Sequence, residues 1–85
     1  IVEWSSHGPC GDGRWKPNLD APGCVTESTL GGTQTGYQSL CGTSMSTPAA
    51  SGVLAGAAEA IPSLAGHAPL YRAWAMAAAL PWQDT

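Results

Sequence analysis

Residues 40–61 read LCGTSMSTPAASGVLAGAAEAI, and the organisation of the chain follows from this stretch. From Thr47 to Ile61 it consists almost entirely of small and aliphatic residues, with Glu59 as its single charge. The alanine content predicts a helix. The lack of a polar face predicts that neighbouring structure covers this helix on all sides. Pro62 is expected to end it, because proline disrupts a helix interior.

A short polar segment stands directly before this helix, at a predicted strand-to-helix junction. Gly42 has no Cβ, so a second backbone can approach it closely, and the Thr43 hydroxyl can cap the helix. Ser44 then lies at the helix N-terminus, where free N–H groups and the helix dipole favour a developing oxyanion. Pro48 cannot donate a hydrogen bond to the Ser44 carbonyl. We therefore expect an irregular first turn that starts near Ser44 and becomes regular after Pro48.

Short strands and turns are predicted upstream of the junction. Residues 1–4 are β-branched enough to suggest a strand, whereas the turn signals that crowd residues 7–23 predict a loop. Two further strands, at 24–30 and 37–40, flank a reversal that begins at Gly31-Gly32. Their pairing predicts a β-hairpin over residues 24–40.

A second helix is predicted from about Pro69 to Leu80, because proline is favourable in a first turn and Pro81 stops the helix. One face of this helix gathers four apolar side chains, Leu70, Trp74, Ala77 and Ala78. The tryptophans are interpreted as packing residues, since stacking on nucleic acid would need basic neighbours. They are Trp4, Trp15, Trp74 and Trp82.

Composition limits the function classes. The 85 residues are 44% hydrophobic, which excludes a disordered tail, and carry a net charge of −3 without a basic run. Binding to nucleic acid or to anionic membranes is therefore not expected. An all-apolar helix needs more cover than two short strands and one helix provide, so the chain is predicted to be the end of a larger α/β domain. Residues 1–4 also lack the pattern of a secretory signal, and a fragment is expected.

Three blocks of sequence carry a resemblance to a known family. Gly-Thr-Ser-Met-Ser-Thr-Pro at 42–48 resembles the nucleophile motif of subtilisin-like serine proteases (subtilases, peptidase S8), written Gly-Thr-Ser-Met-Ala-x-Pro. Ser-Ser-His-Gly-Pro at 5–9 is similar to the family's Ser-Ser-Arg-Gly-Pro. The block at 12–23, Asp-Gly-Arg-Trp-Lys-Pro-Asn-Leu-Asp-Ala-Pro-Gly, is similar to Asp-Gly-Arg-Ile-Lys-Pro-Asp-Val-Val-Ala-Pro-Gly. The blocks follow the family's order, and the resemblance covers residues 4–60.

The resemblance implies a Ser-His-Asp endopeptidase on a three-layer α/β/α fold with a parallel sheet. Residues 1–85 would be the C-terminal portion of that single peptidase domain, incomplete at its N-terminus. The implied partners are polypeptide substrates and the remainder of the catalytic domain, and the implied location is extracellular. No organic cofactor is implied, and no metal site is expected.

The same resemblance assigns roles near the junction. Ser44 would be the nucleophile that forms the acyl-enzyme, and its own N–H would be an oxyanion donor, helped by the Thr43 hydroxyl. The residues expected to border the substrate cleft are Leu40, Cys41, Gly42 and Met45, with Met45 on the leaving-group side.

The rest of the triad is expected elsewhere. The family's catalytic Asp, catalytic His and oxyanion Asn all precede the residues matched here. His7 occupies the family's Arg position, and His67 lies in a predicted surface loop, so neither is assigned as the base. A serine without a base is a weak nucleophile, so the 85-residue chain alone is predicted to be inactive. Two alternatives stay open: a non-catalytic remnant or interaction module, and a small binding domain held by a disulfide or by zinc.

The three cysteines permit three single pairings, each of which leaves one thiol. Cys10 and Cys24 flank the turn-rich loop, so a disulfide between them is one hypothesis. Cys41 is then the free thiol. The absence of a Cys-x-x-Cys pair argues against a zinc site formed with His7, and Asp12 and Asp20 are a weak signal for calcium.

Overall fold

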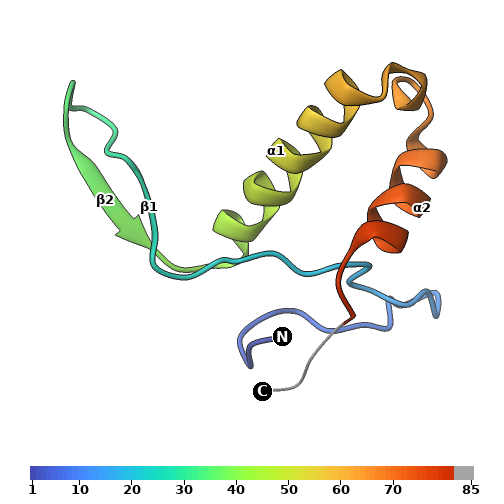
Figure 1. Cartoon of the computed structure of the whole chain (residues 1–85). Helices are drawn as coiled ribbons and strands as arrows, with labels where there is room; N and C mark the ends of the chain where they lie inside the picture. The colour runs from blue at the N-terminus through green and yellow to red at the C-terminus, as the bar shows by residue number, and fades with distance from the viewer. Residues whose placement is uncertain (82–85) are drawn as a thin grey trace.

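A computed structural model describes residues 1–81, and Figure 1 traces the chain. The fold is mixed α/β. Its elements, in order, are β1 (Thr26–Thr29), β2 (Tyr37–Leu40), α1 (Thr43–Ala60), the 3₁₀ helix η1 (Pro62–Leu64) and α2 (Ala68–Ala78). The loop of residues 1–25 runs beneath the helices, while the hairpin projects to the opposite side of α1 from α2 (Figure 1).

The predicted hairpin is confirmed. β1 and β2 pair antiparallel, with Thr26 opposite Leu40 and Thr29 opposite Tyr37. The N–H of Leu30 donates to the Gly36 carbonyl at 2.8 Å and closes the loop between the strands. β1 is shorter than the predicted strand over 24–30, because the chain on either side of it turns into the junction and into the loop.

The strand predicted at residues 1–4 is wrong. The chain turns there instead, and the N–H of Ser5 donates to the Val2 carbonyl at 3.0 Å. Within residues 1–81 the sheet contains β1 and β2 alone, so this segment has no partner strand. β-branched composition therefore did not suffice to make a strand here.

Helix α1 is continuous from Thr43 to Ala60, with Pro48 inside it. The irregular first turn expected up to Pro48 is not found, because proline withholds one donor and the neighbouring turns retain theirs. The predicted end is confirmed: the N–H of Ile61 donates to the Ala57 carbonyl at 2.7 Å, and Pro62 then begins η1.

Helix α2 begins one residue before the predicted Pro69 and ends at Ala78, with His67 as its N-cap residue. Its inner face is half-buried at Tyr71, Trp74 and Ala75. The predicted face is correct for Trp74, but Leu70 is 50% exposed, and Ala77 and Ala78 are also exposed. One hydrogen bond joins the two helices directly, from the Tyr71 hydroxyl to the Leu54 carbonyl at 2.8 Å.

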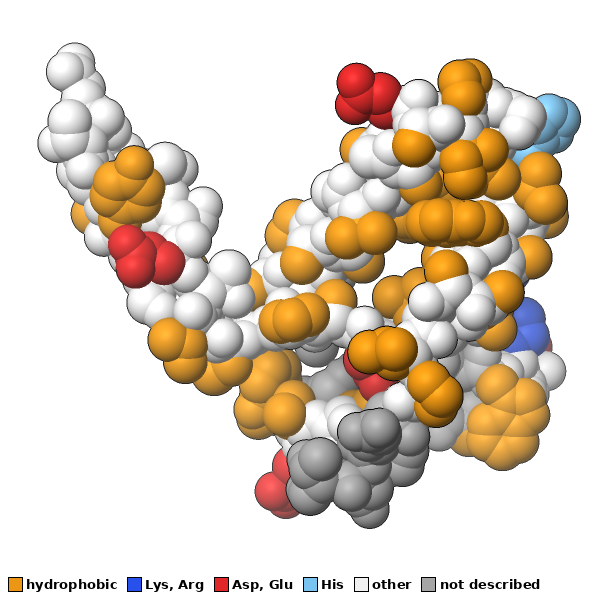
Figure 2. Space-filling view, viewed as in Figure 1, with side chains coloured by type: hydrophobic (Ala, Val, Ile, Leu, Met, Phe, Trp, Pro, Cys, Tyr) orange, Lys and Arg blue, Asp and Glu red, His pale blue; other side chains and the backbone are white. Residues whose placement is uncertain are grey.

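The predicted burial of α1 on all sides is not found within the described chain. Ala57 and Leu64 are the buried apolar residues among 1–81, and no side chain there is fully buried. The accessible surface is 6703 Å², against about 4,700 Å² for a compact monomer of this mass. The radius of gyration is 15.2 Å, against about 12 Å. Figure 2 shows apolar side chains over the outer faces of both helices.

The tryptophans differ in their surroundings. Trp74 is half-buried as predicted, whereas Trp4 is 54% exposed and Trp15 is 81% exposed, so neither of these packs into a core of this chain. Trp82 lies outside the described residues. Across residues 1–81, neither helix combines the length and the apolar character needed to cross a bilayer.

Candidate active site

The start of α1 is fixed against the loop that precedes the hairpin. The N–H of Gly42 donates to the Gly23 carbonyl at 2.7 Å. A Cβ on Gly23 would collide with the Ser46 hydroxyl and would lie 2.7 Å from the Gly42 carbonyl oxygen. Gly23 is therefore in backbone contact with the first turn of α1, a contact that any side chain at this position would disrupt.

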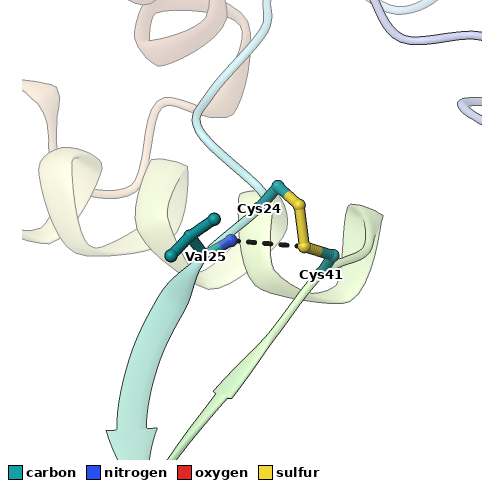
Figure 3. The surroundings of a disulfide bond; sticks show 3 residues. All are labelled: Cys24, Val25 and Cys41. Carbon is teal, nitrogen blue, oxygen red and sulfur yellow. Dashed lines mark hydrogen bonds between the residues drawn. A yellow bond between two sulfur atoms is a disulfide. The ribbon is translucent and has the colours of Figure 1, made fainter.

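A disulfide lies beside this contact and corrects the cysteine hypothesis. The bond joins Cys24 to Cys41 (Figure 3). Cys10 is the free cysteine. The pairing of Cys10 with Cys24 and the assignment of Cys41 as the free thiol are both wrong. The Gly23–Gly42 hydrogen bond explains the outcome, because it brings the residues next to each glycine together.

Ser44 is the second residue of α1 and is exposed to solvent. Gly42 is the N-cap residue, and no side chain caps the helix, so the capping role predicted for Thr43 is wrong. Helical geometry leaves the first N–H groups of α1 without acceptors inside the helix. Among residues 1–81, the N–H groups of Thr43 and Ser44 have no backbone acceptor, and the Ser44 hydroxyl has no hydrogen-bond partner.

Two hydroxyl groups in the next turns of α1 bond back to the helix backbone. The Thr47 hydroxyl donates to the Thr43 carbonyl at 3.0 Å, and the Ser51 hydroxyl donates to the Thr47 carbonyl at 3.0 Å. Pro48 lacks the N–H that would otherwise bond the Ser44 carbonyl. The exposed start of the helix thus offers free donors beside an unengaged hydroxyl, which is the arrangement that stabilises an oxyanion.

The four residues predicted to border a cleft are close to Ser44 in the sequence, but they differ in exposure and in contacts. Leu40 ends β2 and is 45% exposed, while Cys41 is held in the disulfide. Gly42 has φ 158° and ψ 164°, a conformation that favours glycine. A Cβ added to Gly42 would lie 3.7 Å from the Met45 sulfur, so this half-buried side chain covers one side of the glycine.

Neither histidine is paired with Ser44. His7 is exposed, and its Nε2 lies 3.4 Å from the Val2 carbonyl oxygen. His67 is exposed at the start of α2.

One acidic side chain is engaged by a neighbouring arginine. Asp12 pairs with Arg14 at 2.8 Å between its Oδ2 and the guanidinium Nε. Among residues 1–81, no group of three or more His, Cys, Asp and Glu side chains is placed to hold a metal ion.

Two hollows lie near the helices. The larger, of about 1090 Å³, is an apolar groove between α1 and α2, closed on one side by residues 16–22. The smaller, of about 380 Å³, is lined by residues of the N-terminal loop together with Thr43, Ser46 and Thr47. Ser44 lines neither hollow and is exposed to solvent.

Sequence reasoning missed Gly23 and Ser46 as neighbours of the junction. The available signal was the Ala-Pro-Gly turn that Gly23 ends, at the entrance to the hairpin that returns the chain to α1. A hairpin brings its two ends together, so the residues just outside it meet.

The comparisons with known proteins give one match. The model of the subtilase family matches residues 1–85, which is the whole chain given. No curated protein and no solved structure matches it.

Proposed function

Because the chain belongs to the subtilase family, we propose that it carries the nucleophile of a serine endopeptidase and that this nucleophile is Ser44. The observation that carries the proposal is the position of Ser44: exposed, second in an 18-residue helix, with its own N–H unengaged within residues 1–81. A hydroxyl so placed can reach a substrate carbonyl while the helix N-terminus receives the resulting charge.

The proposed reaction passes through an acyl-enzyme. The Ser44 Oγ attacks the carbonyl carbon of the scissile peptide bond and loses its proton to a histidine base. The carbonyl oxygen becomes an oxyanion, which accepts a hydrogen bond from the Ser44 N–H, with the Thr43 hydroxyl as a second donor. The amine leaves with the proton from the base, and water then hydrolyses the ester.

The base must come from other polypeptide. Neither His7 nor His67 is hydrogen-bonded to Ser44, and an unassisted serine is a weak nucleophile. We therefore propose that residues 1–85 are the C-terminal portion of a catalytic domain of the three-layer α/β/α type. The catalytic Asp, the catalytic His and an oxyanion Asn would come from its other part, and the isolated chain is inactive.

The exposed apolar surfaces support this view of the domain. Val53 is 66% exposed in the middle of α1, and the groove between the helices is lined largely by alanine and aliphatic side chains. Surfaces of this kind are normally covered. We propose that the remainder of the catalytic domain covers them, as it would for a helix that is apolar on all sides.

Substrate and location follow from the same proposal. Leu40, Cys41, Gly42 and Met45 border the cleft in which a polypeptide lies, with Met45 on the leaving-group side. The Cys24–Cys41 disulfide is typical of proteins that fold in an oxidising compartment, which supports secretion.

A fluorophosphonate probe tests the proposal on the complete polypeptide that contains these residues. The serine oxygen displaces fluoride from the probe only when it is activated, and peptide mapping then locates the adduct. The expected result is one adduct, on Ser44. It should be absent in Ser44→Ala and retained in Ser51→Ala, which removes a hydroxyl from the same helix two turns later. A folded polypeptide without an adduct on Ser44 would identify a non-catalytic remnant.

A further inference from the structure

The connection between the hairpin and α1 depends on few bonds. Within residues 1–81, no hydrogen bond joins residues 26–40 to residues 43–60. The connections that remain are the Gly42–Gly23 hydrogen bond, at 2.7 Å, the Cys24–Cys41 disulfide beside it, and a hydrogen bond from the Val25 N–H to the Cys41 sulfur. The disulfide is therefore the one covalent tie, apart from the chain itself, that holds the start of α1 against the loop.

A strained residue stands next to the disulfide. Val25 has φ 53°, a left-handed conformation that costs a β-branched residue free energy and persists only where its surroundings impose it. Its N–H donates to the Cys41 sulfur at 3.2 Å (Figure 3). Val25 is 81% exposed, so its side chain is not held by packing, and the bonds of its backbone to the disulfide are what restrain it.

From these contacts we propose that the Cys24–Cys41 disulfide is a positioning device for Ser44, and that its reduction lowers the reactivity of this serine while the protein stays folded. The proposal rests on the proposed function of Ser44 as the nucleophile. Cys41 precedes Ser44 by three residues, and the intervening Gly42 has the freedom to redirect the chain once the tie is lost.

The redox step is a two-electron exchange with a dithiol. A thiolate of the dithiol attacks one sulfur of the disulfide and the other leaves as a thiolate. The second thiol of the reagent then displaces the first protein sulfur from the mixed disulfide. Cys24 and Cys41 each end with one proton, and the reagent becomes a disulfide. Both cysteines are exposed to solvent, so the reagent can reach them without unfolding the chain.

The consequence for Ser44 is geometric. Once the disulfide is reduced, water can replace the Gly42–Gly23 hydrogen bond, because no covalent bond holds the two segments together. Val25 can then leave its left-handed backbone conformation. The first turn of α1 then shifts relative to the groups that act on Ser44. Because a displacement of about 1 Å can cost roughly 100-fold in rate, we expect the reactivity of Ser44 to fall at least about tenfold.

The experiment titrates the complete polypeptide with dithiothreitol and measures the rate of fluorophosphonate labelling at Ser44. Tryptophan fluorescence and circular dichroism report the folded fraction in the same samples. The expected result is a loss of labelling rate of at least about tenfold, at constant folded fraction, that reoxidation reverses. Cys10→Ser should respond in the same way. In a double variant, Cys24→Ser with Cys41→Ser, Ser44 should be labelled slowly, and dithiothreitol should not change the labelling rate.

Other outcomes overturn the proposal. An unchanged labelling rate after reduction does so, and so does a rate that falls only in proportion to the unfolded fraction. A second readout, amide hydrogen exchange of residues 42–46, separates this proposal from the proposed function. If the oxidised protein is never labelled at Ser44, the function fails. Faster exchange after reduction still supports the positioning of this turn by the disulfide, and unchanged exchange refutes it.

Discussion

The N–H of Gly42 donates a hydrogen bond to the carbonyl oxygen of Gly23 at 2.7 Å, and this bond fixes the first turn of α1 against the loop before the hairpin. Gly23 leaves no room for a side chain, and the backbone conformation of Gly42, with φ 158°, favours glycine. The two residues meet because the hairpin between them returns the chain to its starting point. This contact also positions Ser44, because Ser44 follows Gly42 by two residues.

Replacement of Gly23 should therefore destabilise the protein. In Gly23→Ala the new Cβ would collide with the Ser46 hydroxyl and would lie 2.7 Å from the Gly42 carbonyl oxygen. Overpacking of this kind costs roughly 1–3 kcal/mol. Urea unfolding of the complete polypeptide measures the loss. Gly31→Ala is the matched control, because nothing lies within 4 Å of the Cβ position there. Equal stability of the two variants would contradict the close contact.

Removal of the Ser46 hydroxyl tests the same contact from the other side. In the double variant Gly23→Ala with Ser46→Ala, the collision with the hydroxyl is gone and the one with the Gly42 carbonyl oxygen remains. We expect part of the lost stability to return, so that the two substitutions are not additive. Strict additivity in the unfolding free energies would show that Ser46 does not contact position 23.

Substitution of valine by glycine should raise the free energy of unfolding at position 25 and lower it at position 53. Val25 has φ 53°, so Val25→Gly relieves a conformation that valine adopts at a cost. We expect a gain of about 0.5–1 kcal/mol in the free energy of unfolding. Val53 is in the interior of α1, and Val53→Gly should lose stability. Denaturant midpoints measure both, and a loss at both positions would refute the strain at Val25.

The link between the helices gives a further prediction. Tyr71→Phe removes the hydroxyl that donates to the Leu54 carbonyl at 2.8 Å. A hydrogen bond of this kind contributes about 1 kcal/mol. Tyr37→Phe is the control, because Tyr37 is 65% exposed and its hydroxyl has no partner within residues 1–81. Thermal unfolding compares the two, and an equal effect would show that the interhelical bond contributes nothing.

The cysteine pairing is directly measurable. Iodoacetamide applied to the unreduced, denatured polypeptide should modify Cys10 and leave Cys24 and Cys41 unmodified. After reduction all three should react. Peptide mapping by mass spectrometry locates the modified residues. Modification of Cys41 before reduction would contradict the Cys24–Cys41 disulfide and would favour the pairing of Cys10 with Cys24.

Features that depend on local sequence were predictable. The hairpin follows from two short strand-forming segments around a Gly-Gly reversal, and α1 follows from its alanine content. The placement of Ser44 in the first turn follows from the same segment. The irregular turn predicted from Pro48 does not form, because a single missing donor near a helix start does not break the turns around it.

Features that depend on distant contacts were not predictable in this way. Cysteine spacing alone allowed three pairings, and the choice among them was made by the Gly23–Gly42 contact, which joins residues 19 apart in the sequence. The strand predicted for residues 1–4 failed because a strand also requires a partner. The exposure of Trp15, at 81%, likewise depends on which surfaces lie nearby rather than on the residue itself.

The hydrolysis of a peptide substrate by the complete polypeptide tests the role of Ser44 most directly. Ser44→Ala should lose at least about 1,000-fold in kcat. Its unfolding midpoint should equal that of the parent, because this exposed hydroxyl has no hydrogen-bond partner within residues 1–81. Ser51→Ala should keep its activity. If Ser44→Ala hydrolyses the substrate as fast as the parent, Ser44 is not the nucleophile.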